Sequence, residues 1–216
     1  MATFKKAKNR NLCFAWGVGV VAIVLAYAFV DRPVAEFVYV HHWQMHLVLL
    51  KQVVEWPAIM VMLAPFLFLL SFAWRNSDSR CRKILVLMAL SILVTYVLKN
   101  ELKWVFSRYW PLTWTHNNLS WIGNHAYGFQ WFQGPWLQGV DATGSFPSGH
   151  TAIAFATLFP IAVYSQRYAW FWILLATLEG ISMVAFDYHF VSDVIAGALL
   201  AITCVSLLFR VLERQR

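Results

Sequence analysis

Six apolar segments, each long enough or nearly long enough to cross a bilayer, limit the folds that this chain can adopt. They lie near residues 12–30, 55–74, 83–105, 149–166, 169–188 and 190–210. The hydrocarbon core of a bilayer needs roughly 20 residues of α-helix to cross it. Inside lipid every backbone N–H and C=O group must be paired, which a helix achieves within one segment. The sequence therefore predicts an all-α, polytopic membrane protein with six transmembrane helices and one domain over residues 1–216.

The composition supports a membrane protein and argues against a nucleic-acid-binding one. Hydrophobic residues make up 60% of the chain and charged residues only 12%, although the net charge is +7. The basic residues stand between the apolar segments, so they report membrane topology and attraction to anionic lipid. Cys13, Cys81 and Cys204 are scattered, which predicts neither a disulfide framework nor a cysteine-rich metal site. We expect the bilayer, and no nucleic acid, as a partner.

The distribution of Lys and Arg predicts the orientation of the chain. Twelve of the 17 basic residues fall in the amino terminus, the loop at 75–83, Arg167 and the carboxyl terminus. By the positive-inside rule both termini are cytoplasmic, and the connections 31–54 and 104–148 and the turn at His189 lie on the outer side. The first apolar segment is longer than a signal-peptide core and lacks a convincing cleavage site, so we interpret it as a retained span.

Two outer segments carry further predictions. The segment from Pro33 to Trp56 mixes apolar side chains with histidines, which suits a helix lying in the membrane interface. Within it His42 and His46 are spaced as i and i+4, but no carboxylate or cysteine follows at ligand spacing, so an interfacial role is favoured over a metal site. The 104–148 loop is long and aromatic, which predicts an aromatic belt, a mouth and lid for lipid chains, or both.

The stretch from Gly144 to His150, ahead of the fourth apolar segment, is typical of a phosphate-binding turn. Pro147 suits the first turn of a helix, and Ser148 and Gly149 leave room for an anion to reach N–H groups that have no intrahelical partner. Those groups and the helix dipole favour phosphate. His150 then stands where it can pass a proton to a leaving group. A plain turn and helix cap with an unrelated histidine is the alternative.

Two other elements place chemistry on the same side of the membrane. His189 and Asp193 are spaced as i and i+4, so the carboxylate can hold one ring nitrogen while the other acts as a base or nucleophile. Lys103 and Arg108, at the end of the third segment, can neutralise the charge of a phosphate ester. We predict that His189 attacks phosphorus in line and carries the phosphoryl group until water removes it.

These residues resemble the three motifs of the type 2 phosphatidic acid phosphatase family, the membrane relatives of the vanadium haloperoxidases. The second motif, Pro-Ser-Gly-His, is intact at 147–150. The first, a Lys followed after six residues by Arg-Pro, keeps Lys103 and the proline but has Trp110 in place of Arg. The third, Ser-Arg, five residues, His, three residues and Asp, keeps its spacing with Met183 in place of Arg. The similarity lies near residues 83–200.

The resemblance implies metal-free hydrolysis of a lipid phosphate or pyrophosphate, without a cofactor. The roles it implies are catalytic for His189, His150 and Asp193, and phosphate-binding for Lys103, Ser148 and Gly149. We expect Arg108 to supply the guanidinium that is missing at Trp110, because it stands two residues earlier. His125 and Lys99 are candidates to replace the charge missing at Met183. Glu179 falls near mid-membrane, where a hydrogen bond to Ser91, Thr95 or Tyr96 is favoured over a catalytic role.

Three other functions are open from the sequence. Loss of the two motif arginines fits a lipid phosphotransferase of the same family, or a lipid-binding or transport protein without catalysis. His150, His189 and Asp193 also match the two-His, one-carboxylate set of a metal-dependent hydrolase. Undecaprenyl pyrophosphate, phosphatidylglycerol phosphate, phosphatidic acid and lipid A phosphates all fit as substrates, and the sequence does not define the oligomeric state. We expect the protein in the bacterial inner membrane, with its site on the periplasmic side.

Overall fold

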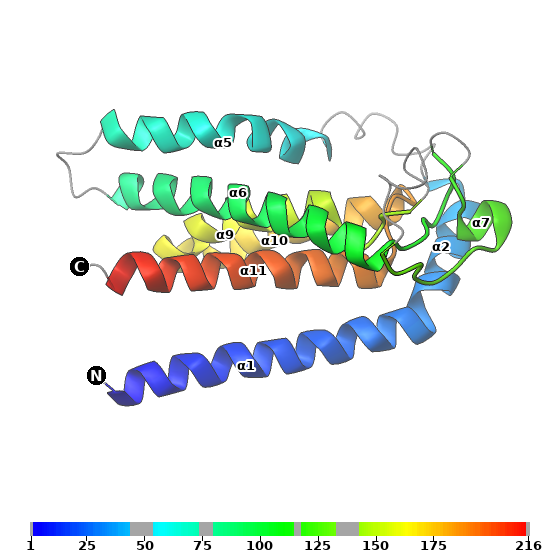
Figure 1. The fold of residues 1–216 in the computed structure, drawn as a ribbon, viewed down its shortest axis with the longest axis horizontal. Coiled ribbons are helices and arrows are strands. Elements are labelled where there is room, and N and C mark those ends of the chain that lie inside the picture. The colour runs from blue at the N-terminus through cyan, green and yellow to red at the C-terminus, as the bar shows by residue number, and fades with distance from the viewer. Residues whose placement is uncertain (1, 44–53, 74–79, 115–117, 133–142, 215–216) are drawn as a thin grey trace.

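The computed structural model describes residues 2–43, 54–73, 80–114, 118–132 and 143–214, which form a bundle of long helices (Figure 1). The long helices are α1 (Ala2–Leu25), α5 (Trp56–Ala73), α6 (Arg80–Phe106), α9 (Gly149–Tyr164), α10 (Ala169–Ala185) and α11 (Val191–Arg214). The shorter ones are η1 (Ala26–Val30), α2 (Asp31–Val40), α7 (Trp121–Asn124) and η3 (Gln166–Tyr168). These ranges contain no β-strand, only two isolated bridges, so the all-α prediction is confirmed for them.

Four helical stretches are long and apolar enough to cross a membrane. They are Phe14–Val40, Arg80–Phe106, Gln166–Ala185 and Val191–Arg214. The apolar parts of α5 and α9, Trp56–Phe72 and Gly149–Tyr164, are shorter. The described residues thus hold four candidate spans instead of the six predicted, and the difference lies in the length of α5 and α9, not in their polarity.

The first helix departs from the predicted span 12–30. It continues from α1 through one π-helical turn, η1, into α2, and the chain changes direction there (Figure 1). Asp31, the first residue of α2, is 1% exposed. The segment predicted to lie in the membrane interface therefore begins inside α2, while residues 44–53, and His46 with them, lie outside the described part of the chain.

Helix α9 is the central helix of the bundle and packs against α5, α6, α10 and α11. Its residues Ala152, Ala154 and Ala156 are fully buried. Small side chains let helix backbones approach closely. Close packing matters in a bilayer because lipid is itself apolar, so the hydrophobic effect does little to hold helices together. The burial of α9 fixes the position of its first turn.

Glu179 finds a different partner from those predicted. Its Oε2 accepts a hydrogen bond from Trp56 Nε1 on α5 at 3.1 Å. The predicted hydroxyl partners Ser91, Thr95 and Tyr96 lie on another helix, α6. The carboxyl group of α10 thus ties that helix to the start of α5.

The functional elements lie at one end of the bundle. The two chain termini are at the opposite end, while α2, α7 and the loop after α6 cluster beyond the end of α6 (Figure 1). The start of α9 and the turn before α11 lie at that same end, so residues from three predicted motifs meet there.

Gly197 marks a close approach of α11 to the start of α9, and its substitution tests this contact. A Cβ atom at this position would lie 2.5 Å from the carbonyl oxygen of Ser148. We expect Gly197→Ala to lower the free energy of unfolding by about 1–3 kcal/mol, because the helices must move apart. Thermal unfolding in detergent measures the change. Gly17→Ala is the matched control, since no other residue lies within 4 Å of its Cβ position. Equal stability of both variants would contradict the close contact.

Candidate active site

The turn between α10 and α11 presents His189 to the site. The N–H groups of Tyr188 and His189 both donate to the carbonyl oxygen of Met183, at 3.0 and 3.2 Å. Asp187 has a φ of 54°, in the left-handed region, which reverses the chain sharply. The Met183 side chain is fully buried and packs with Phe186. Met183 therefore supports the turn through its backbone and does not line the pocket beside His189.

His189 and Asp193 form a buried pair at the predicted i, i+4 spacing. Nδ1 of His189 lies 3.6 Å from Oδ2 of Asp193, and the two side chains are 4% and 0% exposed. The hydroxyl of Ser145 donates to the same Oδ2 and lies 3.4 Å from Nδ1. The N–H of Phe190 also donates to Oδ2, at 3.1 Å. The carboxylate is fixed on the Nδ1 side of the ring, which leaves Nε2 as the candidate reactive nitrogen.

The surroundings of His189 keep its ring uncharged. Burial lowers the pKa of His189 to about 4, although the hydrogen bond with Asp193 raises it, and the charge of Lys103 lowers it further. A neutral imidazole has a lone pair on one nitrogen, so it can act as a nucleophile or base at neutral pH.

A pocket of about 640 Å³ opens beside His189. It brings His189 together with three other residues singled out in the sequence, His150, Lys103 and Gly149, and with Lys99. Aromatic side chains form much of the remaining wall: Tyr96, Trp110, Trp114 and Tyr188. A volume in this range holds a small ligand or the headgroup of a larger one.

Lys103 lies close to both Trp110 and the start of the motif stretch. Its Nζ donates to the carbonyl oxygen of Gly144 and lies 5.2 Å from the centroid of the Trp110 ring. The Trp110 ring is 5.4 Å from the ring of His189. The residue that stands in place of the family's arginine thus forms an aromatic wall directly beside the candidate nucleophile.

Of the two candidates to replace the charge missing at position 183, only Lys99 reaches the pocket. Its side chain lies beside Gly149, and its Nζ donates to the Asn100 side chain at 2.7 Å. His125 instead packs against Trp121, with ring centroids 5.5 Å apart. The pocket therefore holds two lysines and no arginine among its described lining residues.

The start of α9 differs from the predicted phosphate cradle. Pro147 precedes the N-cap Ser148 and is not in the first helical turn. The N–H of Ser148 donates to the carbonyl oxygen of Asp193 at 3.0 Å, and its hydroxyl pairs with Thr151 at 3.0 Å. Ser148 therefore ties α9 to α11 instead of lining the pocket. This geometry does not support the predicted phosphate contact of Ser148. Of the predicted phosphate-binding turn, only Gly149 and His150 line the pocket.

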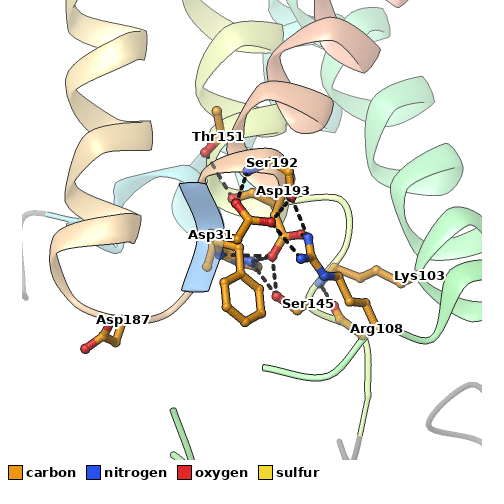
Figure 2. Close-up of polar contacts among 12 residues, drawn as sticks. Asp31, Lys103, Arg108, Ser145, Thr151, Asp187, Ser192 and Asp193 are labelled. Atoms are coloured by element: carbon orange, nitrogen blue, oxygen red, sulfur yellow. Dashed lines mark hydrogen bonds and ion pairs between the residues drawn. The ribbon is translucent and has the colours of Figure 1, made fainter. Parts of the chain in front are cut away.

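Arg108 lies fully buried between two carboxylates (Figure 2). Its Nη2 donates to Asp31 Oδ2 at 2.7 Å, and its Nη1 donates to Asp193 Oδ1 and to the Ser192 hydroxyl, the latter at 2.6 Å. All three charged side chains are 0% exposed. Burial lowers the pKa of Arg108, but attraction to the carboxylates of Asp193 and Asp31 outweighs this effect, so the pKa lies above its ordinary value.

Aromatic rings enclose the rest of the Arg108 guanidinium. Its Cζ lies 4.4 to 5.4 Å from four ring centroids, those of Tyr27, Tyr127, Phe129 and Phe190. Arg108 does not line the pocket, so this geometry does not support its predicted role as a phosphate ligand. The reason is that Asp31, far away in the sequence, turns the side chain away from the pocket and toward Asp193.

Four polar residues of the site were missed in the sequence. They are Asp31, Glu55, Ser145 and Ser192. Glu55 Oε2 lies 3.5 Å from His150 Nε2 at the pocket wall. Asp31 gave a usable signal, because a carboxylate that follows an apolar span is costly unless it has a partner. The serines and Glu55 stand in no spacing pattern that would have separated them from ordinary loop residues.

The metal-dependent alternative is not favoured by the geometry. Asp193 is fully buried, and its oxygens accept hydrogen bonds from Arg108, Ser145 and the Phe190 N–H. Among the described residues, no three His, Cys, Asp or Glu side chains converge in a way that could hold a metal ion. To bind a metal ion, Asp193 would have to give up these contacts.

The fold and the site define a helical, multispanning membrane protein with a histidine and carboxylate pair in a lysine-lined pocket. The chain belongs to the PAP2 superfamily, whose family model matches residues 82–216. The family resemblance predicted from the motifs is thereby confirmed. The matched part includes α6, α9, α10 and α11, but not Asp31 or Glu55.

Individual relatives align with only part of this chain. The chain is 26% identical over 136 residues to the bacitracin transport permease protein BcrC of Bacillus licheniformis, an alignment that covers 63% of this chain and 59% of that protein. It is 42% identical over 66 residues to a lipid A 1-phosphatase of Porphyromonas gingivalis, covering 28% of this chain and 15% of that protein. The chain thus spans less than two thirds of either relative. A crystal structure of a PAP2-type phosphatidylglycerolphosphate phosphatase from Bacillus subtilis matches 94% of this chain and 96% of that one, with 18% identity and a TM-score of 0.45.

The lowered pKa of His189 predicts that its ring stays uncharged at about pH 5.5, where an ordinary histidine is mostly protonated. Histidine-selective ¹⁵N NMR of the protein in detergent measures this directly, and His189→Gln assigns the signal by its disappearance. A titration midpoint of His189 near the ordinary histidine value would show that the ring is less buried than described.

Proposed function

We propose that this protein is a membrane lipid phosphatase that hydrolyses a phosphate monoester or pyrophosphate of a lipid, through a phosphohistidine on His189 and without a metal ion. The observation that carries the proposal is the position of His189. Its Nδ1 faces the carboxylate of Asp193, while the ring lines a pocket that also contains His150 and two lysines. Membership of the PAP2 superfamily and the names of the relatives support a phosphatase.

In the first step, Nε2 of His189 attacks phosphorus, and the bond between phosphorus and the leaving oxygen breaks. His150 gives its proton to that oxygen, so the lipid alcohol or lipid phosphate leaves without an unfavourable charge. The attacking ring becomes positively charged as the N–P bond forms. Asp193 stabilises this charge by accepting the hydrogen bond of the Nδ1–H group, and it holds the ring in the attacking orientation.

In the second step, water attacks the phosphohistidine. His150, now neutral, takes a proton from the water, the N–P bond breaks, and inorganic phosphate leaves. Glu55 lies 3.5 Å from His150 Nε2, so it can accept a hydrogen bond from the protonated ring between turnovers. If a lipid hydroxyl replaced water, the same step would transfer the phosphoryl group, which is the phosphotransferase alternative.

Phosphate binding falls to the lysines and the start of α9. Lys99 and Lys103 offset the negative charge of the phosphate, which would otherwise repel the nucleophile. The backbone N–H groups of Gly149 and His150, the first two residues of α9, add the favourable field of a helix N-terminus. The aromatic wall around Trp110 makes the pocket apolar on one side. Such a wall favours a substrate whose lipid portion begins close to the phosphate.

The site lies on the periplasmic side of a bacterial inner membrane in this proposal. Six spans, with α5 and α9 crossing as shorter helices, bring both termini to the cytoplasmic side. The excess of Lys and Arg around the termini and the 75–83 loop supports this orientation.

A panel assay tests the proposed activity. Purified protein in detergent should release inorganic phosphate from one or more of phosphatidic acid, phosphatidylglycerol phosphate, undecaprenyl pyrophosphate and lipid A, and EDTA should leave the rate unchanged. Loss of activity in EDTA that added metal restores would support the metal-dependent alternative. Transfer of label to a second lipid without phosphate release would support the phosphotransferase.

Variants of the catalytic pair should have unequal effects. We expect His189→Ala to abolish turnover and Asp193→Asn to reduce kcat by about 10³- to 10⁴-fold, because the first removes the nucleophile and the second only misorients it. Acid-labile labelling of the protein by ³²P-substrate should disappear in His189→Ala. His41→Ala is the matched control, since His41 is exposed at the end of α2 and bonded to the Phe37 carbonyl oxygen. Substantial turnover by His189→Ala would refute the mechanism.

The orientation is tested through Cys81, which is exposed at the start of α6. In a variant whose other two cysteines are replaced by Ala, a membrane-impermeant maleimide should label Cys81 only after the inner membrane is opened. Leu119→Cys in the same background, at an exposed position near α7, should be labelled in cells with an intact inner membrane. The reverse pattern would invert the orientation.

A further inference from the structure

Asp31 is a buried carboxylate at the junction of η1 and α2. It is 1% exposed and lies outside the segment that the PAP2 family model matches. Burial of an unpaired carboxylate in a membrane protein is costly, so its partners account for its presence. Those partners belong to the loop after α6 and to the first turn of α11, where the proposed catalytic pair lies.

Asp31 uses both carboxylate oxygens. Its Oδ1 accepts the N–H of Ser192 at 2.9 Å, and its Oδ2 accepts Nη2 of Arg108 at 2.7 Å and the Ser192 hydroxyl. The hydroxyl of Tyr127 lies 3.4 Å from the same Oδ2. Figure 2 shows the contacts that link the Arg108 guanidinium to the carboxylates of both Asp31 and Asp193.

We propose that Asp31 is a positioning residue for the reaction, which acts on His189 through Arg108 and Asp193. The inference rests on the proposed function. Asp31 holds Nη2 of Arg108, so that only Nη1 faces Asp193 and contacts Oδ1. The other oxygen of Asp193, Oδ2, is thereby left to face His189, together with the Ser145 hydroxyl and the Phe190 N–H group that also donate to it.

The charge balance gives this arrangement its effect. Two carboxylates share one guanidinium, so the cluster of Asp31, Arg108 and Asp193 keeps a net negative charge. Through Asp193 this charge can stabilise the His189 ring when the ring becomes positive. Without the charge of Asp31, both terminal nitrogens of Arg108 could pair with Asp193 in the strong bidentate manner. Asp193 would then be neutralised and drawn away from Nδ1.

The effect should fall on kcat and not on KM, because Asp31 does not line the pocket. We expect Asp31→Asn to lower kcat by about 10- to 100-fold, because even a misplacement of about 1 Å in a reacting group can cost roughly 10²-fold. KM for the most rapidly hydrolysed lipid of the panel should change by less than about twofold. Glu36→Gln, on the same helix at an exposed carboxylate bonded to Trp121, is the matched control and should leave both constants unchanged.

A double variant tests whether Asp31 acts through Arg108. Arg108→Gln alone leaves Asp31 without its cation, whereas Asp31→Asn with Arg108→Gln removes both charges. If the two residues act as one unit, the double variant loses no more activity than the worse single variant, because their effects are not additive. Losses that multiply would overturn the proposed route through Arg108.

A second variant covers failure of Asp31→Asn to fold. Ser192→Ala removes the hydroxyl that links Asp31 to Arg108 without changing charge or creating a large cavity. It should lower kcat by about threefold or more, again with KM preserved. A kcat of either folded variant within about twofold of the parent protein would overturn the inference, since hydrogen bonds between buried charged groups contribute more than this.

A measurement independent of turnover separates this inference from the proposed function. In ¹⁵N NMR of the parent protein, His189 should carry its proton on Nδ1, facing Asp193, and Asp31→Asn should weaken that tautomer preference. An unchanged His189 spectrum in a folded Asp31→Asn protein overturns the inference. Absence of phosphate release from every lipid of the panel, with the spectral change present, would overturn the proposed function alone.

Discussion

A guanidinium buried in a membrane protein is stable only when carboxylates and hydroxyls surround it, and this requirement joins three parts of the chain. Arg108 comes from the loop after α6, Asp193 from α11, and Asp31 from the junction of α1 and α2. Removing the Arg108 charge would leave two buried carboxylates uncompensated, which costs several kcal/mol. The geometry of the candidate active site therefore depends on contact between the first helix and the part of the chain that the family model matches.

The arginine and the lysines divide two electrostatic tasks. The lysines line the pocket, while Arg108 is enclosed by aromatic rings and pairs with Asp193. An ammonium group is a compact point charge, whereas a guanidinium imposes a planar, bidentate geometry on an anion. In the proposed reaction, a pocket lined by lysines and bordered by Trp110 would hold phosphate with less directional constraint than one lined by arginines. The planar guanidinium of Arg108 is bound instead to Asp193, the carboxylate that orients His189 in the proposed mechanism.

The sequence predicted the features that depend on local spacing. The apolar segments predicted the helices because a span must satisfy its own backbone. The i, i+4 spacing predicted that His189 and Asp193 meet, although His189 lies in the turn just before α11 and not on the helix itself. The direction of Arg108 could not be predicted, since it depends on Asp31, 77 positions away in the chain. Likewise the contact between Ser148 and Asp193 depends on how closely α9 and α11 pack, which no local pattern encodes.

The contact at Gly197 has a mechanical consequence. Because the backbones of α9 and α11 touch there, close to the Ser148 to Asp193 hydrogen bond, the two helices cannot slide past each other near the site. One carries His150 and the other Asp193. A bilayer that becomes thinner or thicker tilts its helices, and these two must tilt together. The distance between the helix positions of His150 and Asp193 is thus insulated from changes in lipid composition by direct contact between the two helices.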